Sequence, residues 1–376
     1  MIAYFDNSAT TKPCAEAVAA MTDALQEGWG NPSSLHKLGI SAARQLRQAR
    51  LAAAALLGCE AERVFFTSGG TEADNWAVFS GVKRLHKRGR HIITTAVEHH
   101  AVLNPVRELE AQGFQVTYLQ PDKYGRIGVE ALEQALRPDT IFVSVMMVNN
   151  ETGAVMPIEK MARLTHRVCP DALFHTDAVQ GFTKVLFRAS SLGADLISVS
   201  GHKIHGPKGV GALYIRKGLS LPPYLYGGGQ EGSYRSGTEA LPAIAGFGAA
   251  CQAAAANLRQ DIAREARLKA LCREGLSQID GLVFLGASEA PHILCVSVPG
   301  LRSQGLINCL QDEEVYVSAG SACAKGHRSH VLQAMGVDSR VIDGAVRISL
   351  SRFTTEEEVA RLVRAMGGAV QRLSRR

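Results

Sequence analysis

The first two-thirds of the chain alternates short apolar segments with longer stretches of helical pattern. Seven of the apolar segments have the length of a β-strand, at residues 64–67, 91–96, 116–119, 141–148, 173–176, 196–200 and 210–215. The segment at 141–148 is apolar on both faces apart from Ser144, as expected for a buried central strand. Strands that alternate with helices in this way predict a mostly parallel sheet covered by helices.

Beyond residue 238 the pattern changes. A long helical stretch continues to residue 279, and strand-length segments at 292–298, 314–318 and 345–350 are combined with helical patterns around 303–312 and 355–374. This block predicts a smaller α+β domain, because a single core stops growing at about 250 to 300 residues and the chain has 376. We expect a large domain at residues 15–250 and a small domain that combines residues 1–14 with 251–376.

The charge pattern and the N-terminus argue against several classes of protein. The 41 basic and 35 acidic side chains are spread without a dense basic tract, so we expect no direct contact with nucleic acid. No secretory signal is recognisable, and the eight scattered cysteines without a Cys-x-x-Cys pair fit a reducing compartment. Residues 240–258 are uncharged, but Pro242 and Gly246 in an Ala-rich stretch favour a soluble helix over a membrane span. We expect a cytoplasmic protein that does not enter a membrane.

Residues 66–75, Phe-Thr-Ser-Gly-Gly-Thr-Glu-Ala-Asp-Asn, form the first candidate site. A strand ends there and a helix begins, so backbone N–H groups, two glycines and the hydroxyls of Ser68 and Thr71 could form a cup for a phosphate group. The segment lacks the lysine of a P-loop and the spacing of a dinucleotide-binding motif. Taken alone, it is equally consistent with a helix cap formed by Thr71 and Asp74.

Two further segments place reactive side chains at strand ends. In residues 197–209 a buried strand leads into a glycine-rich turn with Lys203, and a lysine in a partly apolar pocket can form a Schiff base with an aldehyde cofactor. A surface-loop lysine is the commoner alternative. Asp177 ends another buried strand. Ligands of open α/β sheets bind beyond the carboxyl ends of the strands, where Gly69, Asn150, Asp177 and Lys203 all fall.

Together these residues predict a site for pyridoxal phosphate. Lys203 would trap the aldehyde, Gly70 and Thr71 would hold the phosphate, and Asp177 would keep the pyridine nitrogen protonated so that the ring accepts electrons.

With these motifs in place, the chain resembles a known family. The segments TSGGTEADN, AVEHHAVL, VNNETGAV, HTDAVQ, SGHKIHGPKG, YRSGTEALP, SAGSAC and RISLSRFTTEEE occur in the order found in the NifS/IscS-like cysteine desulfurases of the class V aminotransferase superfamily. The resemblance extends from Tyr4 to the last helix. It implies the α/β fold type I of pyridoxal-phosphate enzymes, with a mostly parallel seven-stranded sheet in the large domain, and a homodimer with shared active sites.

Carried over by motif, the resemblance makes Lys203 the Schiff-base lysine and Asp177 the partner of the pyridine nitrogen. His99 would stack on the ring and could relay protons, whereas a plain core or surface histidine is the better interpretation of His100. The remaining cofactor contacts that the resemblance implies are Gln180 and Asn150 near the phenolic oxygen, Gly70, Thr71, Ser200 and His202 at the phosphate, and Thr238 at the phosphate of the other subunit.

The resemblance also implies a substrate clamp and a nucleophile. Arg347, with its planar bidentate fork, would bind the substrate carboxylate beside Asn150, and Arg352 is a weaker candidate. Cys323 separates a desulfurase from an aminotransferase: its small and polar neighbours suggest a loop in which a thiolate is exposed. Cys323 could also join His327 and His330 as zinc ligands, but such sites usually need a fourth ligand, so we expect no metal.

The implied reaction converts L-cysteine to L-alanine and leaves sulfur as a persulfide on Cys323, which passes it to an acceptor protein. The segment between Cys323 and Val331 is shorter than in members that supply iron–sulfur scaffolds, and the chain ends at Arg376 without their C-terminal extension. Thiolation of tRNA or of a cofactor is therefore as consistent with the sequence as iron–sulfur cluster assembly. A selenocysteine lyase, an ordinary class V aminotransferase and a catalytically inactive sulfur carrier are the alternatives.

Overall fold

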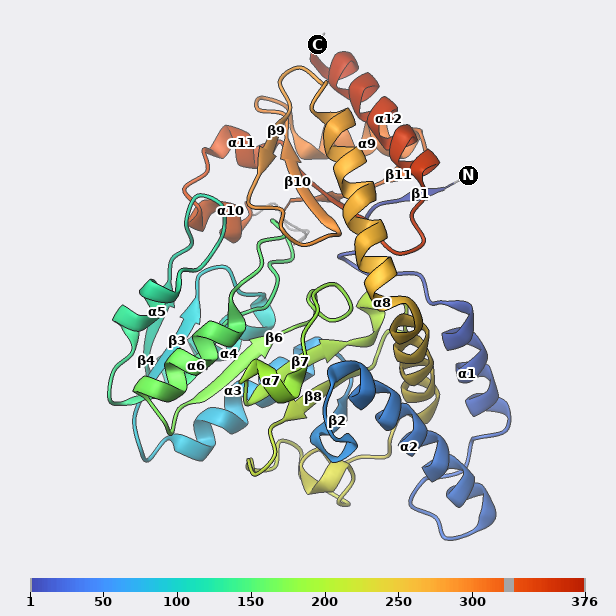
Figure 1. The fold of residues 1–376 in the computed structure, drawn as a ribbon, viewed down its shortest axis with the longest axis vertical. Coiled ribbons are helices and arrows are strands. Elements are labelled where there is room, and N and C mark those ends of the chain that lie inside the picture. The colour runs from blue at the N-terminus through green and yellow to red at the C-terminus, as the bar shows by residue number, and fades with distance from the viewer. Residues whose placement is uncertain (1, 321–327, 375–376) are drawn as a thin grey trace.

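The protein, seen here as a computed structural model that describes residues 2–320 and 328–374, contains a seven-stranded sheet, a four-stranded sheet and a short two-stranded sheet (Figure 1). The larger sheet has seven strands in the order β2-β8-β7-β6-β5-β3-β4, all parallel except β8. The expected mostly parallel seven-stranded sheet is thus confirmed. Its strands are β2 (Val64–Thr67), β3 (His91–Thr95), β4 (Gln115–Leu119), β5 (Thr140–Ser144), β6 (Leu173–Asp177), β7 (Leu196–Ser200) and β8 (Gly211–Ile215).

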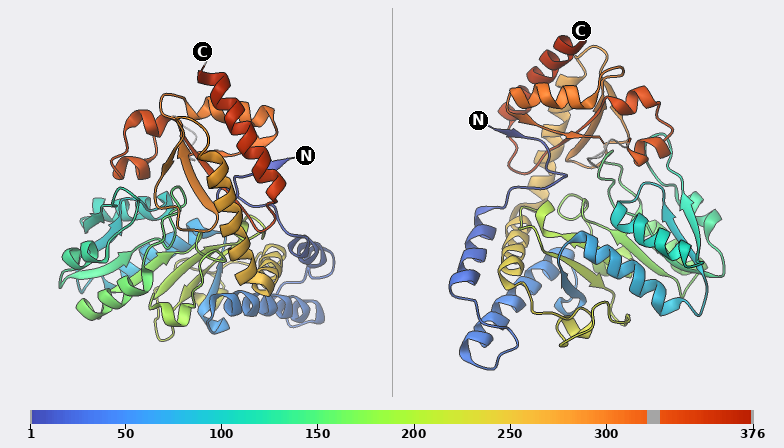
Figure 2. Two further views of the ribbon diagram at one scale, coloured as in Figure 1. Left: turned by 45° about the horizontal axis from the view of Figure 1, so that its top comes forward. Right: turned by 180° about the vertical axis from the view of Figure 1, so that it is seen from behind.

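Helices cover both faces of this sheet, as its fully buried central strands β5, β6 and β7 require. On one face α3 (Gly70–Leu85) and α4 (His100–Ala111) bury Trp76 and Val102 against Ile92 and Phe142, and α3 crosses the sheet in the rear view of Figure 2. The opposite face carries a second buried cluster, built from α1 (Ala15–Gln26), α2 (Lys37–Leu57), α5 (Val129–Ala135), α6 (Ile158–Val168), α7 (Ala189–Leu192) and the first half of α8 (Leu241–Leu276).

The smaller unit has an antiparallel sheet in the order β12-β13-β10-β9 and its own apolar core, which includes Leu294, Leu306, Val346 and Leu362. The expected α+β unit is present. Its elements are β9 (Val283–Leu285), β10 (Ile293–Ser297), α9 (Ser303–Asp312), β12 (Ser318–Ala319), α10 (His330–Ala334), α11 (Ser339–Asp343), β13 (Ala345–Ser349) and α12 (Glu356–Ser374).

The N-terminus belongs to this smaller unit. Strand β1 (Ala3–Tyr4) pairs in parallel with β11 (Val315–Tyr316), and the N label in Figure 1 lies beside α12. Asn7 continues the contact, because its side-chain amide donates to the carbonyl oxygen of Ser349 (2.9 Å). The first residues of the chain therefore enter the pocket region from the small sheet.

Helix α8 connects the two units. It changes direction at Asn257, whose φ of −130° is not helical, and it packs on α1 and α2 before this point and on α12 after it. By length and composition α8 could cross a membrane, but 44% of its apolar window is buried, and a core helix of a soluble protein passes the same test. The expected division of the chain near residue 250 stays a prediction.

The close approach of α2 and α8 gives a test of stability. A Cβ atom at Gly248 would lie 2.5 Å from the Cα atom of Ala49, a main-chain atom that cannot rotate away. Gly248→Ala should therefore lower the free energy of unfolding by about 1 to 3 kcal/mol. Gly368→Ala is the matched control in α12, where an added Cβ meets no atom within 4 Å, and it should raise the same free energy by about 0.5 to 1 kcal/mol. Urea denaturation of both variants would measure this difference, and equal effects would contradict the packing described.

Candidate active site

A pocket of about 390 Å³ opens where β5, β6 and β7 end and α3 begins. The residues named from sequence that line it are Gly70, Thr71, His99, Asn150, Asp177, Gln180, Ser200, His202, Lys203 and Arg347. Two others, Thr238 and Arg352, do not line it. Thr238 is exposed on the loop after the 3₁₀ turn η3 (Glu231–Ser233), Arg352 lies near Asp261 (3.9 Å between Nη1 and Oδ2), and Cys323 lies outside the described residues.

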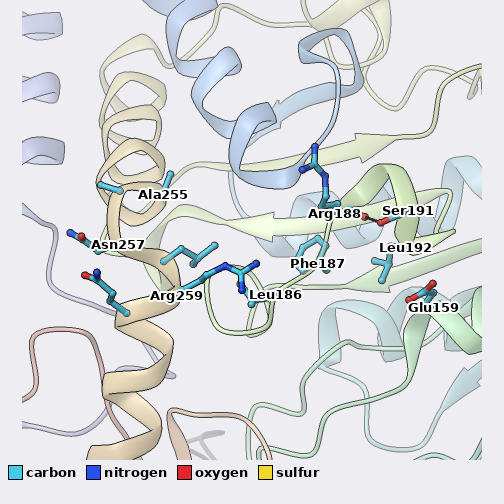
Figure 3. A pocket seen from close by; sticks show the side chains of 12 residues that line it. Glu159, Leu186, Phe187, Arg188, Ser191, Leu192, Ala255, Asn257 and Arg259 are labelled. Carbon is cyan, nitrogen blue, oxygen red and sulfur yellow. Dashed lines mark hydrogen bonds between the residues drawn. The ribbon is translucent and has the colours of Figure 1, made fainter.

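A second and larger hollow of about 660 Å³ lies beside the kink of α8 (Figure 3). Arg188, Arg259 and Glu159 stand on its walls, and none of the residues predicted from sequence reaches it. We therefore place the chemistry in the smaller pocket, where polar groups from several strand ends converge.

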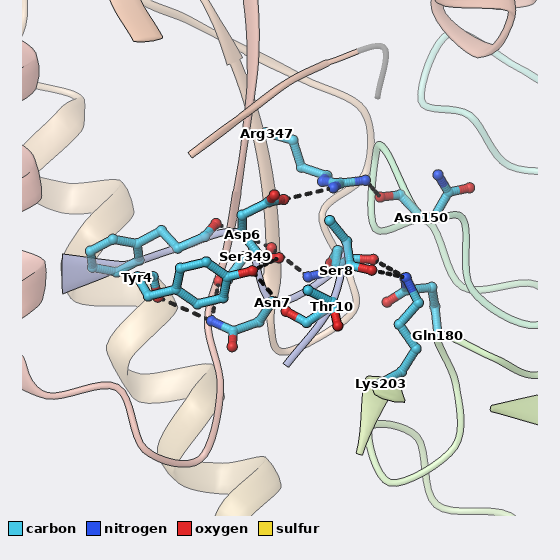
Figure 4. Close-up of polar contacts among 12 residues, drawn as sticks. Tyr4, Asp6, Asn7, Ser8, Thr10, Asn150, Gln180, Lys203, Arg347 and Ser349 are labelled. Atoms are coloured by element: carbon cyan, nitrogen blue, oxygen red, sulfur yellow. Dashed lines mark hydrogen bonds and ion pairs between the residues drawn. The ribbon is translucent and has the colours of Figure 1, made fainter. Parts of the chain in front are cut away.

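Lys203 ends the 3₁₀ turn η2 (Gly201–Lys203) that follows β7. Its ammonium group donates hydrogen bonds to the carbonyl oxygens of Ser8 (2.5 Å) and Ala9 (2.7 Å), as Figure 4 shows. Burial, assisted by the positive charge of Arg347, lowers the pKa of Lys203 to about 8, against the opposing effect of Asp177. A neutral amine, which is the form that attacks an aldehyde, is therefore accessible near physiological pH.

Asp177 is the last residue of β6 and is buried. Its Oδ1 accepts a hydrogen bond from the backbone N–H of Val179 (2.8 Å). Burial raises the pKa of Asp177 to about 6, whereas the Val179 N–H and Lys203 act to lower it. Asp74 lies nearby on α3, and both its burial and the charge of Asp177 raise its pKa. Ionising both neighbouring carboxyl groups would cost free energy, because their negative charges repel. Asp74 therefore keeps its proton, and Asp177 carries the negative charge.

The first turn of α3 is the candidate phosphate cup. Gly69, which precedes the helix, has φ +152°, a conformation that residues with a side chain avoid. An added Cβ at Gly70 would lie 2.7 Å from the Cγ2 atom of Val179. Facing this turn in the pocket, the buried Oγ atoms of Ser200 and Ser8 have no hydrogen-bond partner among the described residues. Free helix N–H groups, unpartnered hydroxyls, the Lys203 amine and the Asp177 carboxylate together fit pyridoxal phosphate.

The two histidines of the pocket are neutral. His99 caps α4, where its Nδ1 accepts from the N–H of Ala101 (3.1 Å), so the ring proton is on Nε2. Although the ring is open to the pocket, desolvation by the surrounding protein and the charge of Lys203 lower the pKa of His99 to about 4. His202, with Nδ1 3.2 Å from Thr10 Oγ1, has its pKa lowered to about 4 mainly by burial. A neutral ring is suited to stacking and to hydrogen bonding.

Described residues on both sides of positions 321–327 are attached close to the pocket. Before this segment, the N–H of Gly320 donates to the carbonyl oxygen of Ala345 (2.9 Å), and Ser318 pairs with Arg347 across β12 and β13. After it, the buried Ser329 hydroxyl donates to the carboxylate of Glu151, the neighbour of Asn150. The sequence positions that flank Cys323 are thus tied to the strand and loop that carry Arg347 and Asn150.

Some pocket residues were not anticipated from sequence. Ser8 and Ala9 contribute main-chain carbonyl oxygens, and Asp74, interpreted above as a helix cap, is buried beneath the pocket. The family resemblance, which begins at Tyr4, was the only sequence signal for Ser8 and Ala9, and it assigned them no role.

Comparison with known proteins agrees with this geometry. The aminotransferase class V family matches residues 3–362. The chain is 41% identical over 374 residues to "Cysteine desulfurase IscS" of Methanosarcina thermophila, covering 98% of this chain and 92% of that protein, and 42% identical to "Cysteine desulfurase" of Cereibacter sphaeroides, covering 98% and 96%.

The chain belongs to the cysteine desulfurases. Among solved structures, a "NIFS-LIKE PROTEIN" superposes with a TM-score of 0.93 at 39% identity over 99% of this chain and 100% of that one. The structure "SspA in complex with cysteine" superposes with a TM-score of 0.82 at 32% identity over 94% and 99%. Cysteine desulfurases are pyridoxal-phosphate enzymes of the class V aminotransferase family, so the expected fold type I and cofactor are confirmed.

The charge of Asp177 can be tested with an isosteric change. Asp177→Asn keeps the shape and should still bind pyridoxal phosphate, but it cannot hold a proton on a ring nitrogen, so alanine formation from cysteine should fall by about 100-fold or more. Steady-state kinetics with the cofactor absorbance as loading control would measure this. The control is Asp139→Asn, which makes the same change at an exposed carboxylate that pairs with Arg137. This variant should retain activity. Retained activity in Asp177→Asn would remove this residue from the mechanism.

Proposed function

We propose that this chain converts L-cysteine to L-alanine and takes the sulfur as a persulfide on Cys323, for transfer to an acceptor protein. The observation that carries the proposal is the convergence of Lys203, Asp177 and Arg347 on one pocket in a chain of the cysteine desulfurase family. Pyridoxal phosphate, when bound, supplies an aldehyde carbon that combines with amines and a ring that accepts electrons.

The side chains then have distinct tasks. The Arg347 guanidinium binds the carboxylate of cysteine, and the neutral amine of Lys203 takes the proton from its Cα atom and later returns a proton to the product. The Asp177 carboxylate holds a proton at the ring nitrogen, which increases the electron demand of the ring. Neutral His99 stacks on the ring and is available to relay protons.

Cys323 completes the reaction. Its thiolate attacks the sulfur of the substrate, an S–S bond forms, and the bond between that sulfur and Cβ breaks with both electrons leaving toward carbon. Proton return to carbon gives alanine, and the enzyme keeps one added sulfur atom as a persulfide. The products balance the reactants without an oxidant.

We also propose a cytoplasmic homodimer in which Thr238 contacts the phosphate of the other subunit, and a small domain of residues 1–14 and 251–376 that carries Cys323. Thr238 is exposed, and Arg235, three residues before it, pairs with Glu72 at the start of α3 (2.7 Å), close to the phosphate cup. An acceptor in iron–sulfur cluster assembly and one in tRNA or cofactor thiolation both fit the chemistry. Covalent capture of the partner disulfide-linked to Cys323 would distinguish them.

Product analysis tests the proposal. Given L-cysteine and a thiol reductant, the protein should release alanine and sulfide in equal amounts. A class V aminotransferase would consume a keto acid and produce no sulfide, and a selenocysteine lyase would release alanine from selenocysteine but not from cysteine. Either of those two results would replace the proposed reaction.

The lowered pKa of Lys203 predicts how cofactor uptake depends on pH. With a pKa of about 8, about 9% of the amine is neutral at pH 7, against about 0.03% for an ordinary lysine. Because the neutral form attacks the aldehyde, the rate at which cofactor-free protein binds pyridoxal phosphate should rise with pH and level off slightly above pH 8. Stopped-flow absorbance would record the profile. A rate that still rises tenfold per unit at pH 9.5 would contradict the lowered pKa.

A further inference from the structure

Arg347 is a buried cation whose Nε atom donates to none of the described residues. Its side chain is only 1% exposed, on β13 beside the pocket. Nη1 donates to the carbonyl oxygen of Asn150 (3.0 Å) and Nη2 donates to the Oδ1 atom of Asp6 (3.0 Å), as Figure 4 shows. Nε is buried and has no partner among the described residues. A guanidinium that is fixed at two nitrogen atoms and has no partner at the third can donate a further hydrogen bond to an anion.

Asp6 is held in place independently of Arg347. Its carbonyl oxygen accepts the N–H groups of Ala9 (3.0 Å) and Thr10 (3.3 Å), and its backbone bridges to Ser349 in parallel. Its side chain is 24% exposed and it is not part of the pocket lining, so it contacts the guanidinium from outside the pocket. The Asp6 carboxylate thus contacts the same guanidinium that would bind a substrate carboxylate.

The position of Asp6 affects how strongly the positive charges of the pocket attract a carboxylate. Among the described residues, Lys203 and Arg347 are the two long basic side chains that line the pocket, and a carboxylate ligand gains from both. A carboxylate on the far side of the guanidinium cancels part of that gain, since at an effective dielectric constant of about 20 charges a few ångströms apart still interact strongly. It also compensates part of the charge of a buried cation.

We propose that Asp6 is a positioning residue that holds the Arg347 guanidinium in its plane and weakens the hold of Arg347 on carboxylates, so that alanine leaves the pocket after turnover. This inference rests on the proposed function for the role of Arg347. Asp6 thus controls the affinity of the pocket for carboxylates although it does not line the pocket.

The test measures ligand binding, so it does not depend on turnover. L-alanine and ethylamine differ only by the carboxylate, and each can be titrated against the cofactor-loaded enzyme through the absorbance of the cofactor. Asp6→Asn retains an acceptor oxygen for Nη2 and removes the charge. It should tighten the dissociation constant of alanine by about fivefold to tenfold and leave that of ethylamine within about twofold. Asp6→Glu, which restores the charge, should return alanine binding toward the wild-type value.

Other results overturn the inference. If Asp6→Asn leaves alanine binding unchanged, or weakens it, Asp6 does not oppose the carboxylate; equal changes for alanine and ethylamine would locate its effect at the amine. Asp6→Ser, also neutral and able to accept a hydrogen bond, provides the same comparison if Asp6→Asn does not fold. Asp139→Asn controls for the loss of one surface charge. A wild-type protein that binds alanine but releases none from cysteine would contradict the proposed function and leave the role of Asp6 measurable.

Discussion

Lys203→Ala should abolish alanine formation from cysteine, with a loss of at least about 1,000-fold in turnover, because the same amine holds the cofactor and moves the substrate proton. Lys203 is the basic residue whose amine reaches the carbonyl oxygens of Ser8 and Ala9, and no other lysine lines this pocket among the described residues. The purified variant should also lack the yellow absorbance of a lysine-bound cofactor. Assays of alanine and an absorbance spectrum would measure both effects.

The appropriate control is an exposed lysine that does not line the pocket. Lys123→Ala removes the same charge from the surface and should keep both the colour and the activity. Addition of a small primary amine to Lys203→Ala should restore a small part of the activity, since an external amine can replace the missing proton acceptor. Turnover at the parental rate in Lys203→Ala would show that the chemistry lies elsewhere.

Cys323→Ser should bind the cofactor and cysteine normally yet release almost no alanine from cysteine, because a serine hydroxyl at neutral pH is not a nucleophile toward sulfur. A loss of at least about 100-fold is expected. The wild-type protein, given cysteine without reductant, should gain the mass of one sulfur atom on the peptide that contains Cys323. Mass spectrometry of the intact chain and of its peptides would measure this gain.

Two other cysteines serve as controls for sulfur transfer. Cys295 is fully buried, and burial raises its pKa to about 12, so its thiolate is scarce. Cys309 is partly exposed and lies on α9 in the small unit. Cys309→Ser should therefore retain full activity. Added sulfur on Cys309 or Cys295, together with an active Cys323→Ser, would overturn the mechanism but not the cofactor site.

Local patterns predicted the elements of the fold well, whereas their arrangement required long-range contacts. The segments at 196–200 and 303–312 coincide with β7 and α9, because burial on both faces and helical periodicity leave clear signals. The antiparallel direction of β8 depends on which neighbours it meets and has no local signature. The single strand expected at 314–318 is two: β11 pairs with β1 and β12 pairs with β13, since the chain changes sheets at Val317.

The candidate site was predictable to the extent that it consists of side chains. Lys203 and Asp177 are chemically distinctive residues at strand ends, so the sequence points to them directly. Ser8 and Ala9 act through main-chain carbonyl oxygens, which every residue possesses and no sequence pattern reveals. Asp74 resembled a cap because it stands in the first turns of α3, and only the packing of α3 on the sheet buries it at 1% exposure.

The attachment of the N-terminus to the small sheet also sets an order of assembly during synthesis. Ala3 pairs with Val315, and the Asn7 amide reaches the carbonyl oxygen of Ser349, a separation of 342 positions along the chain. A ribosome that adds about 5 to 20 residues per second will have released the whole large sheet well before these partners emerge. Strand β1 therefore meets its partner only after all the strands of the large sheet have been made. Because Arg347 lies on β13, a nascent chain that stops before this strand lacks one of the residues that line the pocket.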